Sequence, residues 1–203
     1  METTNPTSNI SKDNLTLNDP DADLMLRFQK GDNRSFEELI CKYEKSVLNT
    51  IYRYTSDRVA AEDIAQEVFL RVFKSRHTYL PKSPFRYWLF SILTNLCLNY
   101  LRDSKHRQTV SIHASEGNPQ VDIKDEKAQA VSDNLKALEL KIAVRDALNS
   151  LPPKQKMVVI LNKYEDASYE EIAAEMKMSV SAIKSLLFRA RESLKEKLKA
   201  KII

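Results

Sequence analysis

The segment Ser168–Lys197, SYEEIAAEMKMSVSAIKSLLFRARESLKEK, decides how the C-terminal part of the chain folds. Ser168 and Glu171 match the S-x-x-E pattern of a capping box, which predicts the start of a short helix. Ser179 is placed to cap a second, longer helix. Apolar residues recur along that second helix at the spacing of one buried stripe: Ile183, Leu187, Ala190, Leu194 and Leu198. A short helix, a tight turn and a longer amphipathic helix are typical of a helix-turn-helix.

The opposite face of the longer helix is polar and basic, as expected of a surface that contacts DNA. It carries Ser181, Lys184, Ser185, Phe188, Arg191 and Lys195. The chain has 32 basic and 28 acidic residues, and the excess of four lies in residues 139–203, which hold 13 basic and nine acidic residues. This charge suits contact with phosphates. A solvated amphipathic helix is the alternative, but the capped helix before it favours the helix-turn-helix.

Composition predicts an all-α protein. The chain has 203 residues, 42% of them hydrophobic, and only two glycines, so tight turns and glycine-rich phosphate loops are nearly excluded. Cys41 and Cys97 lie in separate apolar-periodic segments, and we expect both to be buried free thiols, as suits a reducing compartment. No apolar run approaches 18 residues and the N-terminus lacks the pattern of a signal peptide, which predicts a soluble, cytoplasmic protein with no membrane insertion.

The pattern of helices and breaks predicts two small helical domains joined by a flexible linker. Residues 1–20 are polar and aperiodic, as in a disordered tail. Residues 21–104 form the first domain, and residues 105–133 have the mixed polar composition of a linker. Residues 134–203 form the second domain. Within these domains we expect helices at 21–30, 34–54, 57–74, 84–104 and 154–164, the fourth of them capped by Ser83 with Pro84 at its first position.

The helix at 57–74 has a second face beside its core stripe. Ala61, Ile64, Val68 and Val72 form the core stripe. A small group of polar residues surrounds one leucine on the other face: Asp63, Gln66, Glu67 and Leu70. Such a group is typical of a docking patch, and a solvated helix face is the alternative interpretation.

Residues 75–103 interleave aromatic side chains with cations, a pattern that suits stacking on unpaired bases. The loop fenced by Pro81 and Pro84 is the better candidate for base contact, because it is polar and adjoins cations. The alternative is that much of this aromatic content, Trp88 included, belongs to the core.

Several motifs together resemble the bacterial extracytoplasmic-function sigma factors. Two parts of that family's pattern are seen, its second region in residues 21–103 and its fourth region in residues 139–199. The first is carried by GDNRSFEELICKY (31–43), AEDIAQEVFLRVF (61–73) and FRYWLFSILTNLCLNYLR (85–102); the second by LPPKQKMVVILNKYEDASYEEIAAEM (151–176) and SAIKSLLFRARESL (181–194). Where the family usually has glycine in the helix-turn-helix turn, this chain has Lys177.

The resemblance implies a subunit that directs core RNA polymerase to promoters and assists in melting them. It implies that Asp63, Gln66, Glu67 and Leu70 dock on the clamp of the polymerase's largest subunit. The minus-ten element would be read and melted by Tyr79, Leu80, Lys82, Arg86, Trp88, Asn95, Asn99 and Arg102. The minus-thirty-five element would be read by Ser179, Ser181, Lys184, Ser185, Phe188, Arg189 and Arg191. The family also implies an anti-sigma partner.

Two other classes of function compete with this interpretation. A stand-alone transcriptional regulator would use only the helix-turn-helix, but it needs no docking face at residues 61–73. An enzyme would need a catalytic or metal-binding constellation. His77, His106 and His113 have no metal-ligand spacing among themselves or with the cysteines, so we expect no catalytic residues, no metal and no cofactor.

Overall fold

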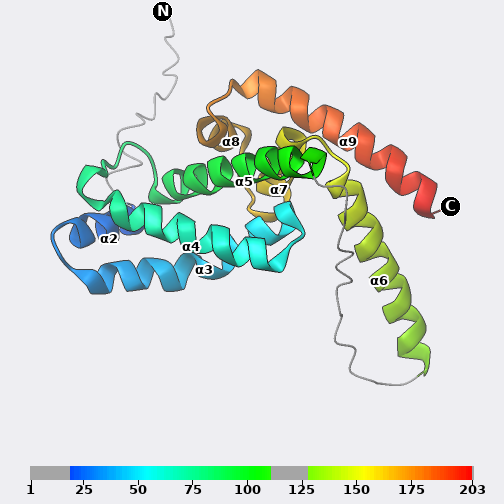
Figure 1. Cartoon of the computed structure of the whole chain (residues 1–203), viewed down its shortest axis with the longest axis horizontal. Coiled ribbons are helices and arrows are strands. Elements are labelled where there is room, and N and C mark those ends of the chain that lie inside the picture. Colours follow the sequence, from blue (N-terminus) through cyan, green and yellow to red (C-terminus); the bar gives the residue numbers. More distant parts are fainter. Residues whose placement is uncertain (1–18, 111–127, 203) are drawn as a thin grey trace, which may run out of the picture.

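The computed structural model describes residues 19–110 and 128–202, and these residues form helices without any strand (Figure 1). This confirms the predicted all-α class. An N-terminal unit (residues 19–110) contains α2 (Pro20–Gln29), α3 (Asn33–Thr55), α4 (Arg58–Lys74), the 3-10 turn η1 (Arg76–Thr78) and α5 (Phe85–Val110). A C-terminal unit (residues 128–202) contains α6 (Ala128–Asn149), α7 (Pro153–Tyr164), α8 (Tyr169–Met176) and α9 (Val180–Ile202). None of the helices within the described ranges is long and apolar enough to cross a membrane.

Aspartates begin the first three helices of the N-terminal unit. The carboxylates of Asp19, Asp32 and Asp57 accept hydrogen bonds from the first turns of α2, α3 and α4. Each of these bonds satisfies a backbone donor that has no partner inside its helix. Gly31, between α2 and α3, has a φ of +103°, which a residue with a Cβ rarely adopts. The helices therefore begin and end where side-chain chemistry permits.

The start of α5 differs from the prediction. The helix begins at Phe85, one residue later than expected, and Ser83 does not cap it. Instead the Phe85 amide donates to the Asp19 carboxylate at 2.7 Å, while the other oxygen of Asp19 accepts from Asp21 at 3.0 Å. One carboxylate thus caps α2 and α5 together. The cap comes from a residue 66 positions away in the chain, which local patterns cannot indicate.

The helix-turn-helix of the C-terminal unit has the predicted geometry. Ser168 and Glu171 form the reciprocal capping box of α8. Lys177 follows α8 in the left-handed conformation, with φ 53° and ψ 47°, where the family pattern has glycine. The Ser179 hydroxyl then accepts from the amide of Ala182 at 3.2 Å and caps α9. Ile183, Leu187 and Ala190 of the predicted stripe are buried, whereas Leu194 and Leu198 further along α9 are only half-buried.

The regular structure extends further into residues 105–133 than we expected. α5 continues to Val110 and α6 already begins at Ala128. The rest of the predicted linker, residues 111–127, and nearly all of the predicted tail lie outside the described residues. A second correction concerns the cysteines, because Cys41 is exposed on α3 while Cys97 is buried as predicted. Cys41 lies on the polar side of its helix, next to the exposed Lys42.

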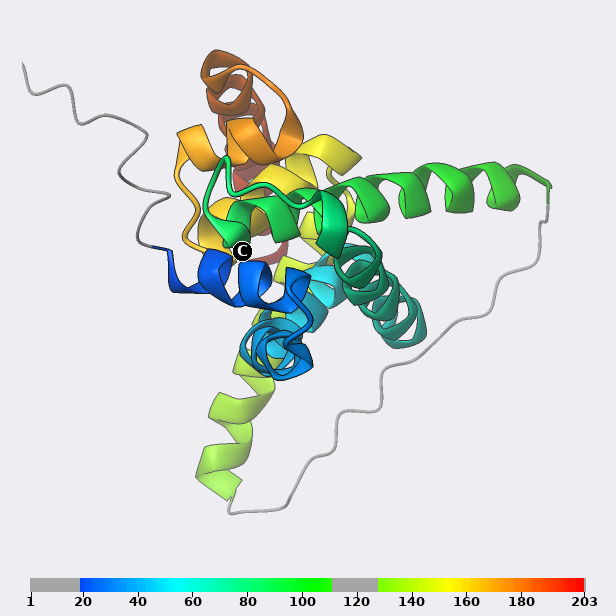
Figure 2. The same ribbon diagram turned by 90° about the vertical axis from the view of Figure 1, so that its left-hand side faces the viewer.

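The two units pack directly against each other. α5 and α3 of the N-terminal unit contact α8 and α7 of the C-terminal unit. Figure 2 shows green α5 running between the blue and cyan helices of one unit and the yellow and orange helices of the other. Buried apolar residues from both units belong to one continuous core, including Phe28, Ile51 and Leu93 on one side and Ile160 and Ile172 on the other.

Candidate nucleic-acid and protein interfaces

The predicted docking face lies on the outer side of α4. Asp63, Gln66 and Leu70 are exposed, and Leu70 leaves 45% of its surface accessible. Glu67 is half-buried and pairs with Arg71, one turn later, at 2.7 Å. The hydrogen bond from Arg71 lowers the pKa of Glu67, so this carboxylate is ionised at neutral pH. The face therefore offers negative charge around one apolar side chain, because the core residues of α4 point the other way.

One face of α5 also points outward. Asn95, Asn99 and Arg102 are exposed, and they follow one another at intervals of four and three residues, so they share one side of the helix. Trp88 begins this row and is half-buried. Its ring packs edge-on against Tyr79, with ring centroids 4.9 Å apart. The row combines amide groups and a guanidinium, which can donate hydrogen bonds to bases or phosphates.

The loop before α5 separates its predicted residues into two classes. Leu80 is 63% exposed and Lys82 is also exposed. Tyr79 is only 2% exposed, because its ring packs against Phe85 and Trp88. Burial raises the pKa of the Tyr79 hydroxyl, which has no hydrogen-bond partner. In this arrangement Tyr79 supports the loop from below, and Leu80 and Lys82 form the surface that a base could meet.

Arg86 does not lie with the other predicted residues of α5. It is two residues before Trp88, and two residues turn an α-helix through about 200°, so the two side chains point to opposite sides. Arg86 packs over Phe90, with the guanidinium carbon 4.6 Å from the ring centroid. It also reaches the C-terminal unit, where it pairs with the Glu165 carboxylate at 3.0 Å. The spacing in the sequence already separates Arg86 from Trp88.

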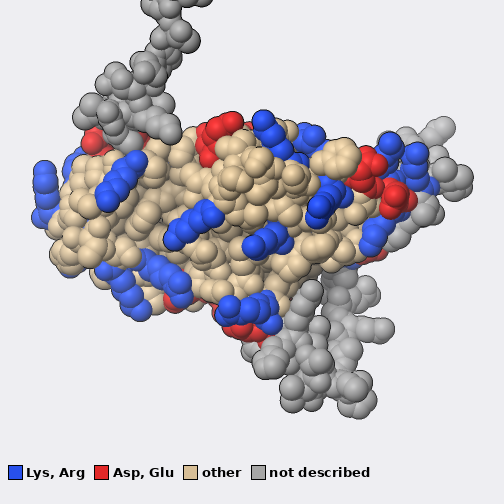
Figure 3. Space-filling model, turned by 90° about the horizontal axis from the view of Figure 1, so that it is seen from above, with Lys and Arg blue, Asp and Glu red and all other residues tan. Residues whose placement is uncertain are grey.

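The recognition surface predicted on α9 is open along its length. Phe188 is 68% exposed, and the other predicted residues of α9 and its cap are exposed too: Ser179, Ser181, Lys184, Ser185, Arg189 and Arg191. Figure 3 views the molecule from the side that is uppermost in Figure 1, where α8 and α9 lie. Lys and Arg are spread over the middle of that face, and Asp and Glu lie nearer its margins. Such a face attracts a polyanion.

Sequence reasoning did not identify the polar contacts between the two units. Ser46 and Thr50 of α3 donate to the Glu165 carboxylate at 2.6 and 2.5 Å. The Tyr87 hydroxyl of α5 donates to Glu171 of α8. These partners lie 84 to 119 residues apart in the chain, and no local pattern links them.

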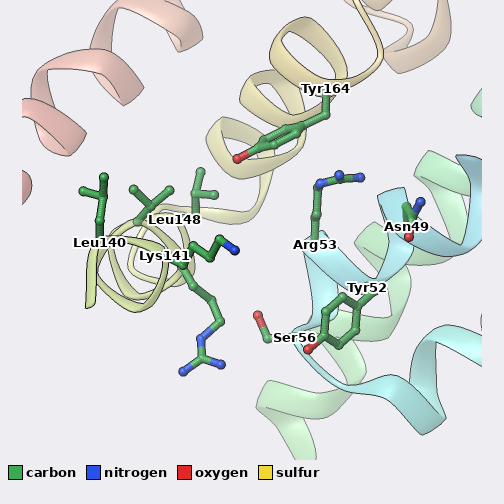
Figure 4. A pocket seen from close by; sticks show the side chains of 10 residues that line it. Asn49, Tyr52, Arg53, Ser56, Leu140, Lys141, Leu148 and Tyr164 are labelled. Atoms are coloured by element: carbon green, nitrogen blue, oxygen red, sulfur yellow. The ribbon is translucent and has the colours of Figure 1, made fainter. Parts of the chain in front are cut away.

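A groove runs along another part of the same boundary (Figure 4). It measures about 660 Å³ and is lined by residues of α3, α6 and α7. Arg53 stacks on the ring of Tyr164, with the guanidinium carbon 4.4 Å from the ring centroid. Tyr52 and Leu140 add apolar surface on opposite sides. The groove shows that the units touch along several separate contacts and leave a hollow between them.

Comparison with known families agrees with both units. The model of Sigma-70 region 2 matches residues 39–107, and that of Sigma-70 region 4 matches residues 141–194. The chain is 29% identical over 187 residues to the RNA polymerase sigma-H factor of Pseudomonas aeruginosa, covering 89% of this chain and 94% of that protein. It is 30% identical over 180 residues to the ECF RNA polymerase sigma-E factor of Haemophilus influenzae, covering 88% of this chain and 95% of that protein.

Solved structures share the fold. One is that of CnrH in complex with the cytosolic domain of CnrY, with a TM-score of 0.65 and 21% identity, covering 90% of this chain and 99% of that one. Another is that of the sigma factor RpoE of Bartonella quintana with the anti-sigma factor NepR, with a TM-score of 0.63 and 23% identity, covering 82% and 98%. The chain thus belongs to the ECF RNA polymerase sigma factors, which are not enzymes and direct RNA polymerase to promoters for transcription initiation.

Proposed function

We propose that this sigma factor divides its work between its two units, with three separate surfaces in named roles. The N-terminal unit binds core polymerase through α4 and reads the minus-ten element through α5 and the loop before it. The C-terminal unit reads the minus-thirty-five element through α9. The observation that carries the division is that three exposed faces of different chemistry lie on three different helices, each backed by a buried stripe.

The docking role of α4 rests on Asp63, Gln66, Glu67 and Leu70. Their side chains face away from the core, and Leu70 supplies an apolar contact within a rim of polar groups. An apolar centre with a polar rim is the usual make-up of a protein–protein interface. We assign this face to the clamp of the polymerase's largest subunit.

The minus-ten role rests on Leu80 and Lys82 in the loop and on Trp88, Asn95, Asn99 and Arg102 along α5. The loop residues are exposed, and Tyr79 of the same loop packs against Trp88, which can stack on a base that has left the duplex. Asn99 and Arg102 continue the same face toward the end of the helix, where they suit contact with the DNA strand next to that base. Tyr79 positions this loop from beneath, and Arg86 stands apart on the other side of α5.

The minus-thirty-five role rests on the exposed face of α9. Lys184 and Ser185 lie in its first turns, where the recognition helix of a helix-turn-helix meets the edges of bases in the major groove. Phe188 offers an apolar surface to a thymine methyl group. Arg189 and Arg191 are placed for phosphates.

The protein's location and a further partner follow from the same assignment. Core polymerase and promoter DNA are its partners, and both place it in the cytoplasm. The Bartonella quintana relative is described in complex with an anti-sigma factor. We extend that kind of partner to this chain as part of the proposal.

Binding to a duplex that carries only the minus-thirty-five element tests the C-terminal role. Lys184→Ala should weaken binding of the full chain by about tenfold or more, because one direct base contact is worth about 1–3 kcal/mol. Lys195→Ala is the matched control, since it removes the same charge from an exposed position about three turns further along α9. Equal losses in the two variants would show that α9 attracts DNA only by its charge.

A further inference from the structure

A group of hydrogen-bond donors on the N-terminal unit surrounds one carboxylate of the C-terminal unit. Glu165 follows α7, and its side chain is only 7% exposed. Ser46 and Thr50, one turn apart on α3, donate to its two oxygens at 2.6 and 2.5 Å. Arg86 of α5 donates to the same carboxylate at 3.0 Å and to the Glu165 backbone carbonyl at 2.9 Å. Two helices of one unit therefore hold a single residue of the other.

Other polar contacts also join the units, and two of them involve charged groups. The Tyr87 hydroxyl donates to the Glu171 carboxylate of α8. Lys156 of α7 is 4% exposed, and its ammonium donates to the backbone carbonyl of Tyr54 at 2.5 Å. That carbonyl belongs to the last turn of α3, where the helix dipole favours a cation. Each contact pairs a charged group of the C-terminal unit with a donor or acceptor of the N-terminal unit.

The chemistry of this boundary suits a contact that opens and closes. A buried charge is tolerated only while it is paired and hydrogen-bonded, so these groups fix one specific packing of the units. If the units separate, water can solvate Glu165, Arg86 and Lys156, because all three are charged. The same boundary also contains buried apolar residues of both units, so separation exposes apolar surface as well, and the polar contacts set which packing is held.

The packed arrangement is too short to read a whole promoter. Elements centred at minus ten and minus thirty-five are about 25 base pairs apart, which is about 85 Å of B-form DNA. In the packed structure α8 lies against α5, and α9 begins four residues after α8 ends. Since a helix with its side chains is about 10–12 Å wide, the first turns of α9 lie within a few helix widths of α5. Both faces cannot reach their elements until the units separate.

We infer that Glu165, held by Ser46, Thr50 and Arg86, is an intramolecular latch that keeps the free sigma factor packed and must release before one molecule engages both promoter elements. The inference rests on the proposed assignment of the two elements to the two units. In the packed state the recognition face of α9 is exposed. The packing prevents α9 and α5 from binding their two promoter elements at the same time.

Distances between spin labels test the latch in the full chain. Cys41 is an exposed natural attachment site on α3, Cys97 is buried, and Glu192→Cys adds a second exposed site on α9. The otherwise unchanged protein should show mainly one short distance. Glu165→Ala should raise the ratio of separated to packed molecules on the order of tenfold or more, because it removes the ion pair with Arg86 and the acceptor of two hydroxyl groups. Glu170→Ala, which removes an exposed carboxylate nearby, should leave the distance unchanged.

Additional variants keep the test decisive. Glu165→Gln retains the size and one oxygen that can accept from a hydroxyl group, and it should give a smaller shift than Glu165→Ala. Lys156→Met removes the second charged contact and should also favour separation. Far-ultraviolet circular dichroism checks that each variant stays helical. An unchanged distance in Glu165→Ala, an equal shift in Glu170→Ala, or a separated population already dominant without substitution would each overturn the latch.

A DNA arm separates failure of the latch from failure of the proposed function. With core polymerase and a promoter duplex that carries both elements, the distance between the two spin labels should lengthen in the protein whose Glu165 is unchanged. With a duplex that carries only the minus-thirty-five element, the distance should stay short. If this short duplex does not bind at all, the assignment of α9 is wrong, while the measurements without DNA still decide whether Glu165 holds the units together.

Discussion

The two DNA-reading helices differ in how the free molecule presents them. The face of α9 is open from its cap to its fourth turn, and Phe188 leaves 68% of its surface accessible. The helix α5 is used on several sides at once. One side carries the exposed Asn95 and Asn99, and another carries Arg86, which is bonded to the C-terminal unit. A helix at the edge of a fold can use its whole exposed face to bind one ligand, whereas a central helix contributes to packing and to binding at the same time.

The same difference appears in the residues that surround each helix. The residues of α9 that point inward are small or aliphatic, such as Ile183 and Ala190. The start of α5 depends on a cluster of aromatic rings formed by Tyr43, Tyr79, Phe85 and Trp88. Substitutions near α5 will therefore change stability and DNA binding together, and substitutions on the face of α9 will change binding alone.

The loop before α5 should show the largest effect and the sharpest contrast. Tyr79→Ala should lower the free energy of unfolding by about 3–5 kcal/mol, because it empties an aromatic position in the core. Leu80→Ala, the next residue, should change it by less than about 0.5 kcal/mol, because that side chain is exposed. Chemical denaturation followed by circular dichroism measures both values. Similar costs for the two substitutions would mean that Tyr79 is not part of the core.

The docking face of α4 tests whether binding and stability separate in the N-terminal unit. Asp63→Ala with Glu67→Ala should weaken the affinity for core polymerase by about 2–5 kcal/mol, because a charged hydrogen bond at an interface is lost. The free energy of unfolding should change by less than about 1 kcal/mol, since both carboxylates lie off the core. Glu62→Ala is the control, an exposed carboxylate of the same helix that pairs with Arg58 at 3.1 Å. Unchanged affinity in the double variant would remove the docking role.

Glu175 should make the stability of the C-terminal unit depend on pH. Its side chain is 2% exposed on α8, and neither carboxylate oxygen has a hydrogen-bond partner. Burial raises the pKa of Glu175 to about 8, although the nearby Arg86 opposes this, while Glu171 and Glu165 add to it. The folded protein therefore keeps a proton that the unfolded chain releases near pH 4.5. Stability from this group is full below that pH and is lost as the pH rises toward 8.

Glu175→Gln should remove that dependence. Between about pH 6 and about pH 8, the free energy of unfolding of the unsubstituted protein should fall relative to the variant by about 1.4 kcal/mol for each pH unit. Urea denaturation at several pH values measures the difference. Parallel curves for the two proteins would show that Glu175 is already ionised in the folded state.

Local patterns predicted the helices well because their signals lie within a few residues. The capping box of Ser168 and Glu171, the cap at Ser179 and the left-handed Lys177 all depend on neighbours in the chain. The buried stripe of α4 follows from periodicity alone. These features required no knowledge of how the helices pack.

Features that depend on distant residues were missed or misplaced. The start of α5 is fixed by Asp19, which no pattern around Ser83 reveals. Tyr79 lies in a segment whose sequence predicts a loop, but its ring is buried in the core because it packs against Phe85 and Trp88. The contacts of Glu165 with Ser46 and Arg86 exist only because the two units pack. Exposure of Cys41 likewise depends on how α3 is oriented.

Open-complex formation on a pre-opened template compares the two DNA-reading surfaces in one measurement. Lys184→Ala and the double variant Leu80→Ala with Lys82→Ala are each assayed with core polymerase on duplex DNA and on the same promoter with an unpaired bubble at the minus-ten element. The bubble removes the cost of unpairing, a few kcal/mol, so it should restore much of the activity lost in the loop variant. It should not restore Lys184→Ala to the same degree, because that residue contacts duplex DNA upstream. Equal rescue of both variants, or of neither, would contradict the division of the minus-ten and minus-thirty-five roles between the two units.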